Sequence, residues 1–370
     1  MKRVLLIFGT RPEAIKMAPL IHAIDAHPKL EAQVCVTAQH REMLDQILEL
    51  FSITPDADLN LMKPGQTLAG LSARILEQLP AAFEELKPDA AIVQGDTTTT
   101  FCSALGAFYA DVPIGHVEAG LRTGDIREPF PEEMNRVLTT RIARWHFPAT
   151  ESNRQTLLAE GVSPDNTFVT GNTVIDALLG VRDRIDRGNC SAATSDFICQ
   201  FARPYILVTG HRRESFGGGF ESICRAIRSL ATSHPELDVV YPVHLNPNVQ
   251  EPVNRILGDV ENVRLIDPLN YEPFVALMCR SRFILTDSGG VQEEAPSLGK
   301  PVLVMRDKTE RQEGLEGGVR LVGTSEERIL EESERLLTDE AHYRQMAEAM
   351  NPYGDGTASK QIAEILAEQL

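Results

Sequence analysis

The stretch VLLIFGTRPEAIKMAPL, residues 4–20, decides the fold. An apolar run that enters a glycine-led turn and continues as a helical pattern is typical of the start of an α/β domain. In that turn Thr10 and Glu13 have the spacing of a helix capping box. Arg11 and Lys16 need another explanation, because a helix N-terminus already carries partial positive charge. Two cations at this position favour a bound anion, such as a phosphate group.

Strand-like and helix-like segments alternate through the first half of the chain. Short apolar runs predict strands at residues 4–8, 32–37, 90–94, 114–117, 145–148 and 167–170. Amphipathic stretches predict helices at residues 14–26, 41–51, 68–86 and 132–143. Strands that alternate with helices form βαβ units around a parallel sheet, so this half is expected to be one α/β domain.

The alternation stops at residues 182–203, which lack a clear period, and then restarts. In the second half, strands are predicted at residues 205–209, 238–242, 263–266, 283–286, 302–305 and 320–322. Two such arrays predict an α/β protein of two Rossmann-like domains that face each other, at residues 1–172 and 173–356. Ligands of open α/β sheets bind beyond the carboxyl ends of the strands, so the residues after each strand are the site candidates.

Composition excludes several classes of function. The 370 residues are 42% hydrophobic and 24% charged, as in ordinary globular proteins, and no apolar run approaches the ~18 residues of a membrane span. The net charge of −17 argues against binding to nucleic acid or to an anionic membrane, because both need a basic surface. The six cysteines form no CxxC pair, which indicates reduced thiols in a cytoplasmic protein and no cysteine-based metal site.

Acidic residues lie close to strand ends in the first half. Asp96 and Glu118 follow successive predicted strands, and Glu132 opens the next predicted helix. Each alone is explained by helix capping or by favourable placement at the positive end of a helix. The carboxyl ends of parallel strands share one edge of a sheet, so the three carboxylates together suggest general acid–base chemistry there.

Histidine, arginine and glycine residues follow the first strand of the second half. His211 comes after that strand and one glycine, next to Arg212 and shortly before a glycine tract at residues 217–219. A lone histidine in a turn is usually structural, but these neighbours also fit a binding loop. No GxGxxG motif follows any strand, which argues against a nicotinamide-dependent oxidoreductase.

The stretch ILTDSGGVQEEAPSLGKPVLVMRDKTERQE holds the clearest local pattern. Its apolar strand is followed by Ser288, Gly289 and Gly290 at a helix start, where backbone N–H groups can approach a diphosphate closely. Glu294 lies about one helical turn further on, in a position suited to a pair of ribose hydroxyls. With arginines after the next strand, this stretch predicts a nucleotide diphosphate site.

Together these segments resemble one family, the bacterial non-hydrolysing UDP-N-acetylglucosamine 2-epimerases. The similarity runs in order across nearly the whole chain, through FGTRPEAIKMAP, TAQHREMLDQ, VQGDTTT, HVEAGLRTGD, PFPEEMNR, GHRRES, YPVHLNP, LTDSGGVQEEAPSLGKPVLVMRD and YGDGTASKQI. The resemblance implies a glycosyltransferase B-type fold with the active site in the cleft between the domains. It also implies that a C-terminal helix, residues 357–370, packs back onto the first domain.

The reaction implied by the resemblance is the reversible conversion of UDP-GlcNAc to UDP-ManNAc, without cofactor or metal. UDP is eliminated to leave a 2-acetamidoglucal and then adds back, and the product serves bacterial cell-surface polysaccharide synthesis in the cytoplasm. The implied catalytic residues are Asp96, Glu118, Glu132 and His211. The implied substrate-binding residues are Arg11, Lys16, Arg136, Phe274, Ser288, Gly289, Gly290, Glu294 and Arg311. A homodimer is also implied, with a second, allosteric UDP-GlcNAc site at Gln39, Gln66, Arg212, Glu214 and His244.

Three alternatives stay open at this point. A hydrolysing relative would release free ManNAc and UDP, because water intercepts the intermediate. A glycosyltransferase of the same fold would pass the sugar to an acceptor. A nucleotide-sugar sensor would need the SGG stretch and the arginines, but not the carboxylates.

Overall fold

The computed structural model describes residues 1–37, 41–61, 65–212 and 217–370. Contacts divide the chain into two units. Unit 1 comprises Met1–Ala177 and Tyr353–Leu370, and unit 2 comprises Leu178–Pro352. Helix α7, Thr173–Asp186, runs across the boundary.

In the described part of unit 1, six parallel strands form one sheet in the order β3-β2-β1-β4-β5-β6. The strands are β1 Lys2–Phe8, β2 Leu30–Val36, β3 Ala57–Asp58, β4 Ala90–Gln94, β5 Ile114–Val117 and β6 Trp145–Phe147. Apart from the short edge strand β3, they are apolar and mainly buried, as expected for a parallel sheet with both faces covered.

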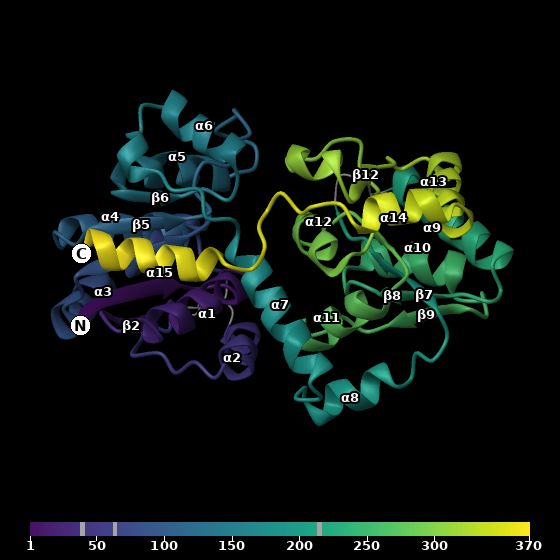
Figure 1. Cartoon of the computed structure of the whole chain (residues 1–370), viewed down its shortest axis with the longest axis horizontal. Helices are drawn as coiled ribbons and strands as arrows, with labels where there is room; N and C mark the ends of the chain where they lie inside the picture. The colour runs from purple at the N-terminus through teal and green to yellow at the C-terminus, as the bar shows by residue number, and fades with distance from the viewer. Residues whose placement is uncertain (38–40, 62–64, 213–216) are drawn as a thin grey trace. The chain divides into compact units, whose positions relative to one another are not determined.

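The helices of unit 1 are α1 Arg11–Asp25, α2 Arg41–Leu50, α3 Leu68–Leu86, α4 Thr98–Tyr109, α5 Glu132–Ile142, α6 Glu151–Ala159 and α15 Ala358–Gln369. Side chains of α3 and α4 pack on β1 and β4 to form one hydrophobic core. The C-terminal helix α15 packs against α1, so the two ends of the chain belong to the same unit (Figure 1).

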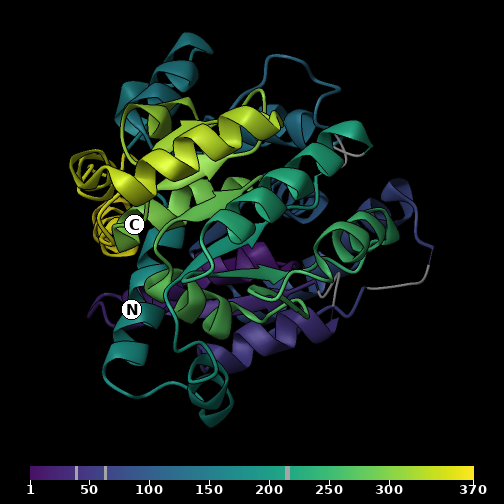
Figure 2. The same ribbon diagram turned by 90° about the vertical axis from the view of Figure 1, so that its right-hand side faces the viewer.

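Unit 2 repeats this topology. Its described residues form a parallel sheet in the order β12-β11-β10-β7-β8-β9. The strands are β7 Tyr205–Thr209, β8 Asp238–Pro242, β9 Val263–Ile266, β10 Ile284–Thr286, β11 Val302–Val304 and β12 Val319–Leu321. The helices are α8 Ala192–Ile198, α9 Gly218–Ser233, α10 Pro247–Leu257, α11 Tyr271–Arg280, α12 Gly289–Glu294, α13 Glu326–Thr338 and α14 Glu340–Ala347. Helices α9, α10 and α13 pack over the strands (Figure 2), and their buried side chains form a hydrophobic core with those of the strands.

Each sheet has a switch point where the strand order reverses. In unit 1 the switch lies between β1 and β4, and in unit 2 it lies between β7 and β10. Loops at such a point diverge and leave room for a ligand beyond the carboxyl ends of the strands. The loops that follow β4, β7 and β10 hold the predicted site residues Asp96, His211 and Ser288.

Three local predictions were wrong. Residues 167–170 are not a strand, because after the sheet edge at β6 they pair only through an isolated bridge between His146 and Thr167. Residues 182–203 contain helix α8, which is capped by Ser191 and packs on α11. Strand β3 was missed because it has only two residues and no apolar run. None of the helices in the described residues combines the length and apolar character needed to cross a membrane.

Candidate active site

Glu13 joins the two loops at the switch point of unit 1. Its carboxylate is buried, with 2% of the residue exposed. One oxygen, Oε2, accepts hydrogen bonds from the backbone N–H groups of Gly9 and Thr10 and from the Thr10 hydroxyl. The other, Oε1, accepts from the hydroxyls of Thr97 and Thr100, at 2.7 and 3.2 Å. The predicted capping box is confirmed, and the same carboxylate also fixes the loop after β4.

Glu118 and Lys16 form a shielded ion pair at the same edge. Lys16 Nζ lies 2.8 Å from Oε1 and 2.6 Å from Oε2 of Glu118, and both side chains are largely buried. The side-chain amides of Gln94 and Asn172 also donate to this carboxylate. Glu118 has a φ of 62°, an unfavourable backbone conformation for a residue with a side chain. The strand end therefore places this carboxylate against a cation at a conformational cost.

Asp96 is held by Arg136 rather than by a helix end. The N-cap of α4 is Thr97, so the capping role that the sequence favours for Asp96 is wrong. Arg136 donates to Asp96 Oδ2 from Nε at 2.8 Å and also reaches Glu133 at 2.9 Å. Burial opposes the charge of Arg136, but the two carboxylates outweigh it and raise the pKa of the guanidinium.

Two further residues of unit 1 bear on this cluster. Glu132 begins α5, one helical turn before Arg136, and is partly buried. His116 was not singled out from the sequence, and its buried ring contacts the Gly95 carbonyl through Nε2 at 2.8 Å. Burial lowers the pKa of His116 to about 3. His116 is therefore a neutral hydrogen-bond donor that supports the residue before Asp96.

Asp287 joins two loops at the switch point of unit 2, as Glu13 does in unit 1. It follows β10 and is fully buried. Its Oδ2 accepts the backbone N–H groups of His211 and Arg212, at 2.7 and 2.8 Å. The ring of His211 is 43% exposed, and its Nδ1 lies 3.6 Å from the other oxygen, Oδ1. The sequence QGD and TDSGG both show an aspartate near a strand end, but only the structure reveals which one is buried.

The SGG stretch opens a helix as predicted. Ser288 is the N-cap of α12, and its backbone N–H donates to the Thr286 hydroxyl. The guanidinium of Arg311 lies over Gly289, so close that a Cβ at Gly289 would come within 2.6 Å of Arg311 Cζ. Arg311 is oriented by Glu293, whose Oε1 accepts from Nε at 2.8 Å. A cation is thus fixed beside the start of this helix.

Comparison with known proteins decides the family. A family model described as UDP-N-acetylglucosamine 2-epimerase matches residues 22–367. The chain belongs to the UDP-N-acetylglucosamine 2-epimerase family. The family predicted from the sequence is therefore confirmed.

Members of the family resemble this chain over its whole length. The UDP-N-acetylglucosamine 2-epimerase of Escherichia coli K12 is 61% identical over 98% of both chains. The crystal structure of the Neisseria meningitidis enzyme bound to UDP-GlcNAc has a TM-score of 0.89 at 48% identity, covering 99% of this chain and all of that one. A putative family member from Listeria monocytogenes has a TM-score of 0.92 at 44% identity, covering 100% and 97%. These matches confirm the glycosyltransferase B-type fold class.

The remaining residues implied by the family resemblance lie in both units. Arg11 is the first residue of α1, and Phe274 is half-buried on α11. Glu294 is buried at the end of α12, where its Oε1 accepts the Tyr271 hydroxyl at 2.7 Å. The ring of His244 stacks on that of His211, with centroids 5.2 Å apart.

The residues of the predicted second site are only partly described. Arg212 lies beside His211, and Gln66 accepts a hydrogen bond from Arg74 in unit 1. Gln39 and Glu214 lie outside the described residues. Of the described members, Gln66 belongs to unit 1, and Arg212 and His244 belong to unit 2.

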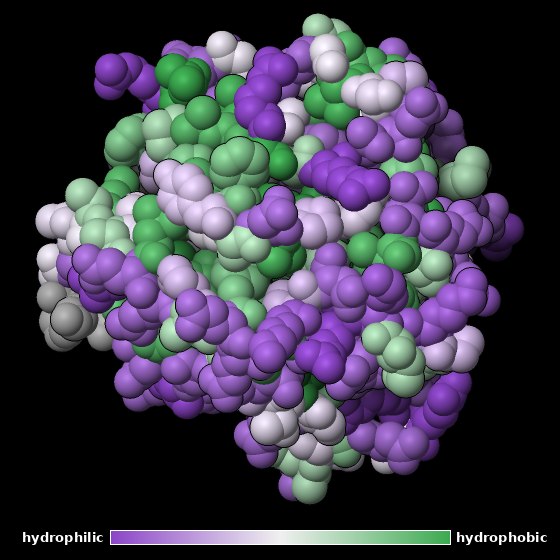
Figure 3. Space-filling view, turned by 90° about the vertical axis from the view of Figure 1, so that its left-hand side faces the viewer, coloured by the Kyte–Doolittle hydropathy of each residue, from purple (hydrophilic) through white to green (hydrophobic). Residues whose placement is uncertain are grey.

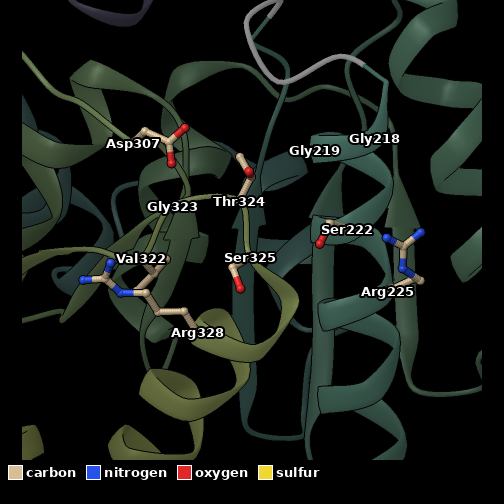
Figure 4. A pocket seen from close by; sticks show the side chains of 10 residues that line it. All are labelled: Gly218, Gly219, Ser222, Arg225, Asp307, Val322, Gly323, Thr324, Ser325 and Arg328. Atoms are coloured by element: carbon tan, nitrogen blue, oxygen red, sulfur yellow. The ribbon is translucent and has the colours of Figure 1, made fainter.

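Two cavities of unit 2 are lined by other residues. The first, of about 450 Å³, lies at the starts of α9 and α13 (Figure 4). It is lined by Gly218, Gly219, Ser222, Arg225, Asp307, Val322, Gly323, Thr324, Ser325 and Arg328. The second, of about 440 Å³, includes Phe197, Val243 and Leu269. The glycine tract after His211 therefore contributes to a cavity separate from the SGG stretch.

Proposed function

We propose that this chain interconverts UDP-GlcNAc and UDP-ManNAc by epimerisation at C2, without net hydrolysis. The observation that carries the proposal is the pairing of carboxylates with cations at the carboxyl edge of the unit 1 sheet, Glu118 with Lys16 and Asp96 with Arg136. Such pairs supply a proton acceptor next to positive charge. The full-length similarity to UDP-N-acetylglucosamine 2-epimerases supports the same activity.

The reaction begins with an elimination. A carboxylate takes the weakly acidic C2 proton while the C1–O bond breaks, and its electron pair leaves with UDP. The product is a 2-acetamidoglucal. UDP then adds back at C1 as a proton is delivered to the opposite face of C2, so atoms and charges balance over the cycle. Asp96, Glu118, Glu132 and His211 are proposed to carry these proton transfers.

The diphosphate is proposed to be retained by cations and backbone donors. Its charge would be met by Arg11, Lys16, Arg136 and Arg311, and the last three would exchange their carboxylate partners for phosphate oxygens where needed. Ser288, Gly289 and Gly290 would donate backbone N–H groups. Glu294 is assigned to the ribose hydroxyls and Phe274 to the uracil. Tight retention of UDP matters because the glucal can be converted back only while UDP stays bound.

NMR of the reaction in heavy water tests the proposal. Purified protein is given UDP-GlcNAc, and the anomeric signals and the C2 proton are followed over time. A stable pool of UDP-ManNAc with deuterium at C2 is expected. Accumulating free ManNAc would instead identify the hydrolysing reaction, and sugar transfer to an added acceptor without C2 exchange would identify a glycosyltransferase. Nucleotide binding without turnover would leave only a sensor.

We further propose that the chain is a homodimer joined through unit 1. Phe108 and Tyr109 at the end of α4 are exposed, and their rings contact each other. Leu138 on the neighbouring helix α5 is exposed as well. Hydrophobic side chains also gather on one face of the molecule (Figure 3). Analytical ultracentrifugation of the wild type and of Phe108→Asp tests this. We expect a dimeric wild type and a monomeric variant, and a monomeric wild type would contradict the proposal.

Two finer aspects of the function are also proposed. UDP-GlcNAc would bind a second, allosteric site formed by Gln39, Gln66, Arg212, Glu214 and His244. We expect the wild-type rate to depend sigmoidally on the UDP-GlcNAc concentration and the rate of Gln66→Ala to depend on it hyperbolically. A hyperbolic dependence in the wild type would contradict this.

The product is proposed to supply cell-surface polysaccharide synthesis from the cytoplasm. A deletion strain is then expected to lose ManNAc-containing polymer.

A further inference from the structure

The two oxygens of Asp287 have different surroundings. Oδ2 accepts two backbone N–H groups, from His211 and Arg212, and this bond pair ties the loop after β7 to the end of β10. Oδ1 is buried and has no hydrogen-bond partner among the described residues. A buried carboxylate oxygen without a donor is unfavourable by roughly 1–3 kcal/mol, so it calls for an explanation.

The ring of His211 faces this oxygen. Nδ1 of His211 lies 3.6 Å from Oδ1, slightly beyond hydrogen-bond distance, and a small rotation of either side chain would close the gap. The ring is also confined from its other face, because His244 stacks on it at an interplanar angle of 10°. The geometry resembles a histidine oriented by a buried carboxylate through the nitrogen that does not face the substrate.

We propose that Asp287 is a positioning residue for His211: it holds Nδ1 in its protonated form, presents Nε2 to the substrate, and stabilises the ring when Nε2 takes up a proton. The inference rests on the proposed function, in which His211 contacts the sugar nucleotide. The proton on Nδ1 stays on the ring throughout, and Asp287 stays ionised. Only Nε2 exchanges a proton with the substrate, so no additional reactant is needed.

The charges around His211 are consistent with this role. Burial lowers the pKa of His211, and Arg212 and His244 lower it further, whereas Asp287 raises it. Among the described residues whose charges act on the ring, Asp287 is thus the one that favours the imidazolium. Removing its charge is expected to leave a histidine that is harder to protonate.

The test compares wild-type enzyme with Asp287→Asn. The asparagine oxygen can still accept the two backbone N–H groups, so the loop keeps its anchor while the charge is lost. We expect kcat for UDP-GlcNAc epimerisation to fall at least 30-fold with KM changed less than threefold, a loss of about 2 kcal/mol in transition-state stabilisation. The NMR titration midpoint of the His211 ring should move to lower pH. The matched control is Glu13→Gln, the buried carboxylate of unit 1, which should leave the His211 titration unchanged.

Two further measurements can also refute the inference. Nitrogen-15 shifts of wild-type His211 report the tautomer directly, and a ring protonated on Nε2 at neutral pH would overturn the proposal even if the variant did not fold. In a double-mutant cycle, adding Asp287→Asn to the His211→Gln variant should lower kcat little further. Unchanged kcat and titration in Asp287→Asn would also overturn it, while epimerisation by the wild type would still stand. Absence of epimerisation in the wild type would instead reject the proposed function. The nitrogen-15 shifts would still show which ring nitrogen of His211 carries the proton.

Discussion

Units 1 and 2 join the loops at their switch points with one buried carboxylate each, and the two carboxylates are satisfied differently. Glu13 accepts five hydrogen bonds, from two backbone N–H groups and three hydroxyls, and both of its oxygens have partners. Asp287 accepts two backbone N–H groups on one oxygen and faces His211 with the other. The buried carboxylate comes from the first turn of α1 in unit 1 and from the end of β10 in unit 2. It holds loops together in unit 1, and in unit 2 it can also serve chemistry.

The comparison extends to the groups at the strand ends. Unit 1 brings carboxylates and cations together as pairs, whereas unit 2 places glycines and an arginine at the start of α12. In the proposed function both units meet the diphosphate with cations, and proton transfer uses the carboxylates of unit 1 together with His211 of unit 2. The glycine-led helix start beside Arg311 is specific to unit 2, so variants of Asp96 and of Gly289 should separate in kcat and in affinity for UDP.

Asp96→Asn should have the largest effect. Arg136 keeps its second partner Glu133 in this variant, so the guanidinium is not left unpaired and the local structure is preserved. Loss of one proton-transferring carboxylate is expected to lower kcat by about 10²–10⁴-fold. Affinity for UDP, measured by calorimetry, should stay within about tenfold, or ~1.4 kcal/mol. An equal loss of UDP binding would assign Asp96 a structural role.

Glu13→Ala should mainly destabilise unit 1. It leaves buried N–H and hydroxyl groups of two loops without an acceptor, which should lower the free energy of unfolding by about 3 kcal/mol. Trp145, the only tryptophan of the sequence, is buried in β6, so its fluorescence during urea unfolding reports on unit 1. Glu13→Gln retains an acceptor and should lose less. If both variants unfold with the wild-type midpoint, the view that Glu13 secures these loops is wrong.

Local pattern predicted most of the fold. The apolar runs located the strands of both sheets except β3, because a buried parallel strand needs a continuous run of apolar residues. The wrong prediction at residues 167–170 has a different cause. A run such as Thr-Phe-Val-Thr has strand propensity wherever it lies, but beside the edge strand β6 it forms one isolated bridge and no continuous ladder, and only the tertiary fold decides this.

The site was predicted less completely, because burial and long-range contacts decide the roles. Asp96 and Thr97 are both good N-caps, and only the backbone geometry shows that Thr97 caps α4. Glu13 was recognised as a cap, yet its bonds to Thr97 and Thr100 span more than 80 residues of sequence. Asp287 lies within the quoted SGG stretch, but nothing in the sequence distinguishes a buried aspartate from an exposed one.

The stability of unit 1 should fall at acidic pH because of His116. The ring is neutral in the fold, with a pKa of about 3, whereas an unfolded histidine titrates near 6.5. Between these values the unfolded chain binds more protons, so stability is highest above pH ~6.5 and decreases as pH falls. At pH 5 the expected loss is about 2 kcal/mol. His116→Gln keeps an N–H donor for the Gly95 carbonyl and should lack this part of the pH dependence in Trp145-monitored unfolding, whereas identical pH profiles would contradict it.

Gly289→Ala should have the smallest effect and the most specific one. The added methyl group would lie 2.6 Å from Arg311 Cζ, and Glu293 holds that guanidinium in place, so Arg311 must leave its position over the helix start. If Arg311 neutralises the diphosphate, Kd for UDP should rise about tenfold, or ~1.4 kcal/mol, with kcat at saturating substrate nearly unchanged.

Gly290→Ala provides the matched control for that variant. A methyl group there meets Glu294 Oε2 at 3.7 Å, an ordinary contact, and Arg311 is not among its neighbours. Its Kd for UDP should change less than threefold. If both alanine variants weaken UDP binding equally, then the lack of a side chain at the start of α12, and not the position of Arg311, determines UDP affinity. A fall in kcat in Gly289→Ala, with UDP affinity retained, would mean that Arg311 acts on the chemical step and does not mainly bind the diphosphate.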